Sequence, residues 1–186
     1  MKRLTNAIQI MIVLVFMVSL SACGNGDIDD FSGTYKSVID DTEIVLKSDN
    51  TAHLLLGNQS EQMEWADIGD SKIILSKGTS DFVCSITGDY LILLDGSEIP
   101  LSGEVSGKRD IEGTLSILKG ENGEKQEYLS FNKDGTLIHG KGEKSWQMEY
   151  ELFGDLAVIH DKGLDNYVLI GDESYLIPME NVMQKK

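Results

Sequence analysis

The sequence predicts an all-β protein built from two tandem antiparallel meanders, and three patterns support this fold. Apolar and polar residues alternate with period two in segments such as 146–152, which is typical of strands with one buried face. Turn signals such as Asp134-Gly135 and Gly154-Asp155 recur about every eight to twelve residues. After residue 22, no segment keeps a helical period for three turns. Short strands between evenly spaced turns indicate meanders that form small barrel-like or sandwich modules.

The two meanders are predicted to be copies of one unit. At an offset of 85 residues, Gln62-Met63-Glu64 falls on Gln147-Met148-Glu149, and Gly69-Asp70 falls on Gly154-Asp155. Self-similarity at a fixed offset indicates one supersecondary unit used twice. At this stage two arrangements stay open: the copies close separately, or they share one larger barrel.

The expected domain ranges follow this repeat. Repeat 1 is placed at 31–104 and repeat 2 at 105–186, with about five to seven strands in each. We interpret the segment from Ser102 to Asp110, with its glycines and basic pair, as a short polar connection. The apolar run Tyr90–Leu94 is typical of a strand that is covered on both faces, which places it where the two copies meet.

The first 22 residues are predicted to be a secretory signal peptide. Lys2 and Arg3 precede the 14-residue apolar stretch 7–20. That stretch is shorter than the ~20 residues that a helix needs to cross the hydrocarbon core of a bilayer. An ordinary signal peptide cleaved near Ala22, or an uncleaved anchor, are the alternatives.

The end of this stretch, Leu20-Ser21-Ala22-Cys23 followed by Gly24, resembles the lipobox of bacterial lipoproteins. The resemblance implies that cleavage precedes Cys23 and that the thiol of Cys23 carries a diacylglyceryl group with acyl chains such as palmitate. Two chains give stable anchoring to the cell membrane. Residues 23–30 would then be an acidic, flexible tether, and the protein would be extracytoplasmic.

The charge of the mature chain excludes one class of partner. The leader carries two basic residues and no acid, so the formal net charge goes from −15 to −15 − 2 = −17. Such a surface repels nucleic acid and anionic lipid head groups, so we expect no nucleic-acid partner. We interpret the charge as a solvated surface, the alternative being weak cation binding by clustered carboxylates.

The start of repeat 1 carries a family resemblance. Phe31-Ser32-Gly33-Thr34-Tyr35 resembles the Gly-x-aromatic opening of lipocalin-like domains. The order that follows, with Asp134-Gly135-Thr136 as its clearest turn, is similar to the small lipocalin-like lipoproteins of Gram-positive bacteria. The resemblance implies barrel modules and no assigned activity. Repeat 2 departs from the pattern at its opening, where Leu115 replaces the aromatic residue.

The chain contains none of the common catalytic motifs, and we predict no enzymatic activity, catalytic residue, metal ligand or cofactor. Neither a Gly-x-Ser-x-Gly elbow, a phosphate-binding loop nor a His-Glu-x-x-His motif is present. The histidines lack the spacing of a zinc site, and we expect a surface or edge position for all three: His53, His139 and His160.

The other residues with chemical potential are expected to be structural. Cys84 is predicted to be a buried small residue, and Glu149 and Glu151 to share the solvated face of one strand. We interpret segment 161–166, which has oxygen ligands near a glycine but no EF-hand spacing, as a loop. Four aromatic residues either fill the cores or line a pocket: Tyr35, Trp65, Trp146 and Tyr150.

These observations favour a non-enzymatic lipoprotein that binds a small ligand or another envelope protein. The alternative is a structural or assembly protein with solid β-modules and no ligand pocket. A cavity inside either copy would distinguish the two, because small closed barrels are usually filled by side chains and only some hold a ligand.

Overall fold

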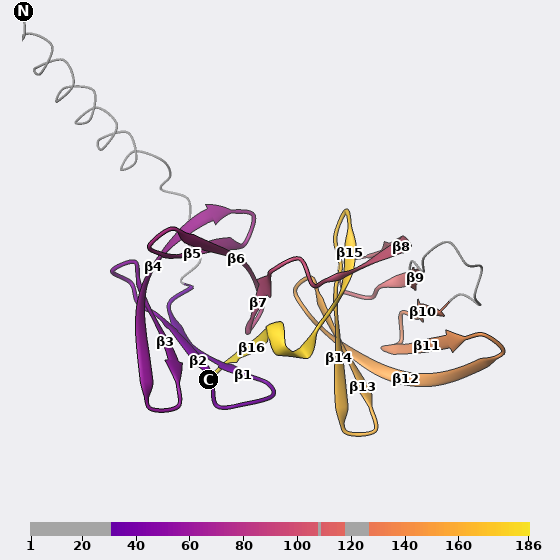
Figure 1. Ribbon diagram of the computed structural model, residues 1–186. Helices are drawn as coiled ribbons and strands as arrows, with labels where there is room; N and C mark the ends of the chain where they lie inside the picture. Colours follow the sequence, from indigo (N-terminus) through magenta and orange to yellow (C-terminus); the bar gives the residue numbers. More distant parts are fainter. Residues whose placement is uncertain (1–30, 108, 118–126) are drawn as a thin grey trace, which may run out of the picture. The chain divides into compact units, whose positions relative to one another are not determined.

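The computed structural model describes residues 31–107, 109–117 and 127–186, and 31–186 form one compact unit. The described chain folds into two closed antiparallel barrels of eight strands each (Figure 1). The predicted all-β fold with two barrel-like modules is therefore confirmed, and the two barrels close separately. The expected number of strands per copy, five to seven, was too low, because each barrel has eight. The predicted signal peptide, Cys23 and the 23–30 tether lie outside the described residues.

Barrel 1 is built from seven consecutive strands and the C-terminal strand of the chain. The chain enters that last strand through a short 3-10 helix, η1 (Met179–Asn181). Its strands are β1 (Gly33–Ser37), β2 (Glu43–Leu46), β3 (Thr51–Leu56), β4 (Gln59–Gly69), β5 (Lys72–Lys77), β6 (Ser80–Thr87), β7 (Tyr90–Leu94) and β16 (Val182–Lys185).

Barrel 2 is a continuous up-and-down meander, closed by pairing of its first and last strands. Its strands are β8 (Ile99–Ser106), β9 (Glu112–Ile117), β10 (Glu127–Phe131), β11 (Thr136–Lys141), β12 (Lys144–Phe153), β13 (Leu156–Asp161), β14 (Leu164–Leu169) and β15 (Ser174–Ile177).

Strand β16 closes barrel 1 across a large separation in sequence. It pairs with β1, where Tyr35 faces Lys185, and with β7, where Leu91 faces Met183. Barrel 2 is therefore inserted in the chain between β7 and β16 of barrel 1, and Figure 1 shows β16 in yellow beside β1 and β7. This eighth strand is the one that local sequence patterns do not assign to repeat 1.

The strand pairing divides the chain differently from the predicted ranges 31–104 and 105–186. Residues 99–106 are β8 of barrel 2, and 182–185 belong to barrel 1. Segment 102–110, interpreted as a polar connection, is in large part strand β8. Within β8, Gly103 has φ +123°, and a Cβ added there would lie 2.1 Å from the carbonyl oxygen of Thr114. The backbones of β8 and β9 are so close at this point that only glycine fits, which explains why a glycine-containing polar segment forms this strand.

The internal repeat is visible in the hydrogen bonds of the turns. Asp49 accepts a bond from the backbone N–H of Thr51 at 3.0 Å, and Asp134 accepts the equivalent bond from Thr136 at 3.0 Å. Further along, the Trp65 N–H donates to the Asn50 carbonyl and the equivalent Tyr150 N–H donates to Gly135, each at 2.9 Å. The predicted duplication is therefore built into the same turns of both barrels.

The two barrels contact each other through an apolar cluster and a pair of interlocked turns. Strand β7 contributes to both faces, because Leu91 lies in the core of barrel 1 while Tyr90 and Ile92 lie in the cluster between the barrels. The prediction of a strand covered on both sides is confirmed. From barrel 2 the cluster receives Leu156, Val158, Tyr167 and Ile177.

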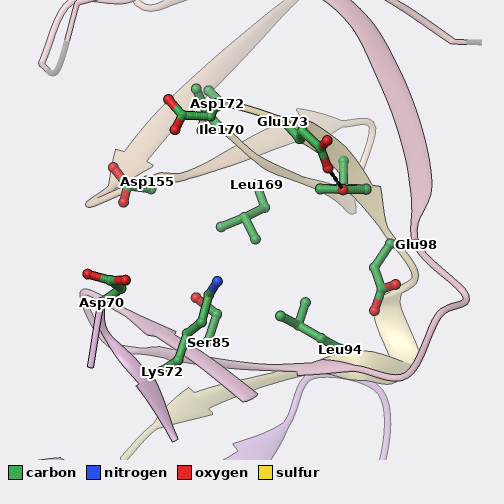
Figure 2. A pocket seen from close by; sticks show the side chains of 12 residues that line it. Asp70, Lys72, Ser85, Leu94, Glu98, Asp155, Leu169, Ile170, Asp172 and Glu173 are labelled. Carbon is green, nitrogen blue, oxygen red and sulfur yellow. Dashed lines mark hydrogen bonds between the residues drawn. The ribbon is translucent and has the colours of Figure 1, made fainter. Parts of the chain in front are cut away.

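The interlocked turns are held by one threonine. Thr87 Oγ1 donates to the carbonyl oxygen of Phe153 at 2.8 Å and accepts from the N–H of Asp155 at 2.8 Å. Gly154 lies directly beneath it with φ +63°, and a Cβ there would be 2.2 Å from Thr87 Oγ1. Beside this joint a cleft opens between the barrels (Figure 2).

The two chain segments that cross between the barrels are also tied together. Asn181, which is buried, donates through Nδ2 to Asp95 Oδ1 at 2.9 Å and contacts Ser97 Oγ at 3.0 Å. Among the described residues, no helix is long and apolar enough to cross a membrane.

Candidate functional site

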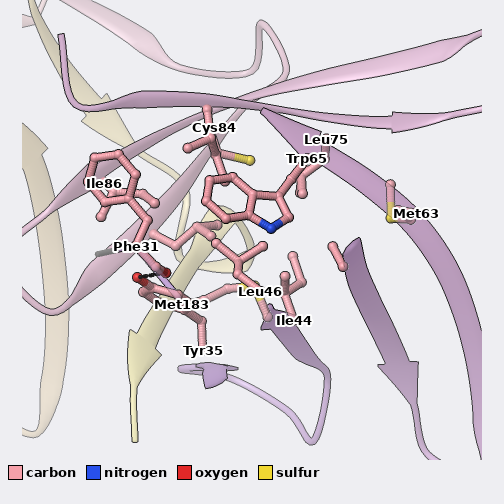
Figure 3. Close-up of a cluster of buried hydrophobic side chains, with 13 residues drawn as sticks. Phe31, Tyr35, Ile44, Leu46, Met63, Trp65, Leu75, Cys84, Ile86 and Met183 are labelled. Carbon is pink, nitrogen blue, oxygen red and sulfur yellow. Dashed lines mark hydrogen bonds between the residues drawn. The ribbon is translucent and has the colours of Figure 1, made fainter. Parts of the chain in front are cut away.

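Barrel 1 has a core of tightly clustered buried side chains, drawn in Figure 3. Trp65 extends across it and donates from Nε1 to the carbonyl oxygen of Lys47 at 2.8 Å. Tyr35 is 1% exposed, and its hydroxyl donates to the carbonyl oxygen of Phe31 at 3.0 Å. Both aromatic rings therefore satisfy their polar atoms inside the core, and they fill barrel 1 rather than line a pocket.

Barrel 2 contains a partly open cavity of about 130 Å³ at one end of its interior. Five apolar side chains form most of the wall, and four polar side chains complete it. The apolar residues are Ile117, Leu129, Met148, Ile159 and Leu176, and the polar ones are Glu127, His139, Asp161 and Asn166.

The alternation of side chains along the strands gives this cavity a polar end and an apolar end. Along β10 the inward positions run from Glu127 through Leu129 to Phe131, and along β13 they run from Asp161 through Ile159. Because β10 and β13 run in opposite directions in this up-and-down barrel, the start of β10 and the end of β13 lie at the same rim. The cavity therefore has an apolar floor beneath a polar rim.

At its opposite end the barrel is closed by aromatic packing. Phe131 and Tyr150 meet edge to face with ring centroids 5.1 Å apart. The Tyr150 hydroxyl lies within hydrogen-bond distance of the carbonyl oxygens of Asn132 (2.8 Å) and Ile111 (3.2 Å). Desolvation by burial raises the pKa of Tyr150, so this phenol is a structural hydrogen-bond donor.

Glu127 is the charged centre of the polar rim. Its side chain is 13% exposed, with Oε1 2.8 Å from His139 Nε2 and Oε2 2.9 Å from Lys141 Nζ. Burial alone would raise the pKa of the carboxyl, but hydrogen bonds and charge from Lys141 and His139 outweigh it and the pKa is lowered. The carboxylate is therefore ionised at neutral pH and fixes the orientation of the imidazole.

Trp146 stands beside this rim. Its ring centroid lies 5.5 Å from that of His139, and it is 40% exposed. Of the four aromatic residues that the sequence marked, it is the only one outside the cores of the described barrels. A half-exposed indole next to a cavity offers a flat apolar surface to an entering molecule.

Two of the four rim positions differ in barrel 1. The Leu129–His139 pair of barrel 2 corresponds to the Ile44–Leu54 pair of barrel 1, and at the 85-residue offset Glu127 corresponds to Thr42. The other two rim positions are polar in both barrels. The ionisable pair formed by Glu127 and His139 is therefore particular to barrel 2.

The histidine prediction is correct in two cases and wrong in one. His53 lies on the exposed side of barrel 1 with its Nε2 3.0 Å from Lys47 Nζ, and exposed His160 pairs with Asp165 at 2.8 Å. His139 instead points into barrel 2. Alternate residues of a strand share one face, and His139 lies two residues after buried Leu137 on β11. This pattern in the sequence could have predicted that His139 faces the interior of the barrel.

The structure also places the other residues that the sequence analysis singled out. Cys84 is fully buried, and desolvation raises the pKa of its thiol to about 12, so it is a core residue as predicted. Glu149 and Glu151 are both exposed, as predicted. Segment 161–166, interpreted as a loop, contains the end of β13, a turn at residues 162 and 163, and the start of β14, with Asp161 and Asn166 at the cavity.

No protein family, no curated protein and no solved structure matches this chain. The cavity therefore has to be interpreted from its own residues. Within the described residues, no group of three or more histidine, cysteine or acidic side chains is placed to hold a metal ion.

Proposed function

We propose that the protein is a lipid-anchored extracytoplasmic lipoprotein that binds a small ligand without catalysing a reaction, and that barrel 2 holds this ligand. The observation that carries the proposal is the cavity of about 130 Å³ with an apolar floor and a polar rim. Barrel 1, with its core of clustered buried side chains, is the supporting module in this proposal.

The cavity limits the ligand in size and in chemistry. A protein cavity of about 150 Å³ holds one benzene molecule, so this one fits a molecule, or the end of a molecule, of about six heavy atoms. The apolar floor suits a hydrocarbon or aromatic body. Asp161 and the ionised Glu127 are hydrogen-bond acceptors at the rim. We therefore propose a compact amphiphile with one hydroxyl or amine donor.

A binding experiment with phenol tests this assignment. We expect phenol to bind to a chain of residues 31–186, which forms one compact unit, and toluene to bind more weakly because it lacks a donor. Met148→Trp places a larger side chain in the wall of the cavity and should weaken phenol binding at least tenfold. Ligand-observed NMR measures both effects.

The matched control is Ile138→Trp, which adds an indole at a residue that is 38% exposed and does not line the cavity. This variant should bind phenol as the unaltered chain does. Equal loss of binding in both variants, or no phenol binding at all, would remove barrel 2 as the ligand site.

The lipid anchor in this proposal rests on Cys23 and the residues before it. Cells that produce the full chain should incorporate labelled palmitate into it, and Cys23→Ser should abolish the label and release the protein from the membrane fraction. Cys84→Ser is the control, because Cys84 is buried and the only other cysteine. Labelling that persists in Cys23→Ser would contradict the anchor.

A structural or assembly role is the second candidate, and the solid core of barrel 1 favours it. In that case phenol and related amphiphiles would not bind, and the full chain would co-purify from membranes with a partner in fixed stoichiometry.

A further inference from the structure

The cleft between the barrels is a second hollow, separate from the cavity inside barrel 2. Its volume is about 870 Å³, within the ~300–1,000 Å³ of small-molecule sites, which occur preferentially at such interfaces between modules. Figure 2 shows Ser85 and Leu94 of barrel 1 on one wall and Leu169 of barrel 2 on the other.

The charges that line the cleft are almost all negative. Five carboxylates and one ammonium group give a formal charge of −5 + 1 = −4. Among the described residues, no three acidic, histidine or cysteine side chains gather around a single point, so the negative charge is spread along the walls. The charged residues are Asp70, Lys72, Glu98, Asp155, Asp172 and Glu173.

Three of these acids are free to meet a ligand. Glu98 accepts hydrogen bonds from the backbone of Asp95 and Gly96, and Glu173 accepts one from the Tyr175 hydroxyl. By contrast, the carboxylates of the three aspartates, Asp70, Asp155 and Asp172, make no hydrogen bond or ion pair within the described chain.

Ser85 is the observation that marks the cleft as a built site. The residue is only 7% exposed, and its hydroxyl makes no hydrogen bond within the described part of the chain. Because no fully buried polar atom of a described side chain lacks a partner, this hydroxyl is the part of Ser85 that stays open to the cleft. Figure 2 shows the side chain directed into the cleft, where the hydroxyl can donate to or accept from an occupant.

Aliphatic side chains lie between the charged groups. Leu94 and Leu169 project into the cleft from opposite barrels, and both belong to the partly buried edge of the apolar cluster between them. A molecule seated here therefore meets hydrocarbon at the centre and carboxylates on both sides.

We propose that this cleft binds a linear aliphatic polyamine. Its ammonium groups lie against Asp70, Asp155 and Asp172, and its methylene segments cover Leu94 and Leu169. One of its N–H groups donates to the Ser85 hydroxyl. Positive charges spaced along a flexible hydrocarbon chain match the negative charges spread along the cleft. The formal charge of the cleft, −4, is equal in magnitude and opposite in sign to that of fully protonated spermine.

Calorimetric titration of the full chain, in non-ionic detergent, with spermine tests the proposal. We expect saturable binding of one spermine per chain that weakens as salt rises, because exposed charges are screened within about 10 Å at 0.1 M salt. The single variants Asp70→Asn and Asp155→Asn should each weaken binding about two- to fivefold, the size of an exposed ion pair. Asp70 has φ +54°, which asparagine also adopts.

The Ser85→Ala variant separates a built site from simple charge attraction. It leaves the net charge unchanged and should weaken spermine binding at least threefold, because a hydrogen bond to an ammonium group is lost. Glu64→Gln is the charge control, since Glu64 is exposed and does not line the cleft, and it should change binding less than twofold.

Two outcomes would overturn the assignment. If Glu64→Gln weakens binding as much as Asp155→Asn, spermine is held only by the overall negative charge of the chain. If Ser85→Ala binds spermine as the unaltered chain does, the hydroxyl is not part of a site. Phenol binding to barrel 2 is measured independently, so failure of one site is distinguishable from failure of the other.

Discussion

A chain that ends at Asn181, without β16, is expected to lose the fold of barrel 1. Val182 and Met183 are 0% and 6% exposed and contribute to two apolar clusters. Full burial of such side chains stabilises a protein by about 1.5–3 kcal/mol each. Strands β1 and β7 would also lose their pairing with β16.

Burial of the two side chains alone contributes about 3–6 kcal/mol, and the lost strand pairing adds to it, against a free energy of unfolding of about 5–15 kcal/mol for a whole domain. Barrel 2 keeps all eight of its strands in this deletion, because they run without interruption from Ile99 to Ile177. We therefore expect amide hydrogen exchange to become fast throughout barrel 1 while the core of barrel 2 stays protected. The exposed edges of β1 and β7 should also promote aggregation.

The control for the deletion is Gln184→Ala, which keeps the strand and changes an exposed side chain within it. It should leave the protection of barrel 1 unchanged. A deletion variant that keeps native exchange rates in β1–β7 would show that β16 is an accessory strand rather than the one that closes the barrel.

The role of β16 also explains where prediction from sequence stopped. Alternation along β12 and the Gly-Asp turns are local features, so they predicted strands, turns and the repeat correctly. Which strand a given strand pairs with is not a local feature of the sequence. Nothing within 182–185 states that it pairs with a strand whose residues lie about 150 positions earlier, and only the closure of the barrel reveals it.

The candidate site was partly within reach of the sequence. The parity of His139 with Leu137 places it inside the barrel, and the same argument applies to Asp161 and Ile159. The cavity itself was not predictable, because it depends on how side chains from several strands fill one interior. In barrel 1 the large side chain of Trp65 lies in the core, while a space of about 130 Å³ remains in barrel 2.

The two tryptophans of the chain are expected to separate stability from binding. Trp65→Ala removes a side chain that is 9% exposed together with its hydrogen bond to the Lys47 carbonyl. Removing a buried tryptophan costs about 3–5 kcal/mol of unfolding free energy. Trp146 is 40% exposed, so Trp146→Ala should cost less than about 1 kcal/mol.

Urea denaturation, followed by circular dichroism of the β-sheets, measures both changes. Because the chain has only two tryptophans, the fluorescence of the one that remains in each variant also reports on the barrel that was not altered. Phenol should still bind to Trp65→Ala below its unfolding transition, since that residue lies in barrel 1. It should bind more weakly to Trp146→Ala, because the indole stands beside His139 at the rim of the cavity. Equal destabilisation by both substitutions would contradict the division between a filled barrel and a binding barrel. The opposite pattern, with stability lost in one variant and affinity in the other, would place support in barrel 1 and recognition in barrel 2.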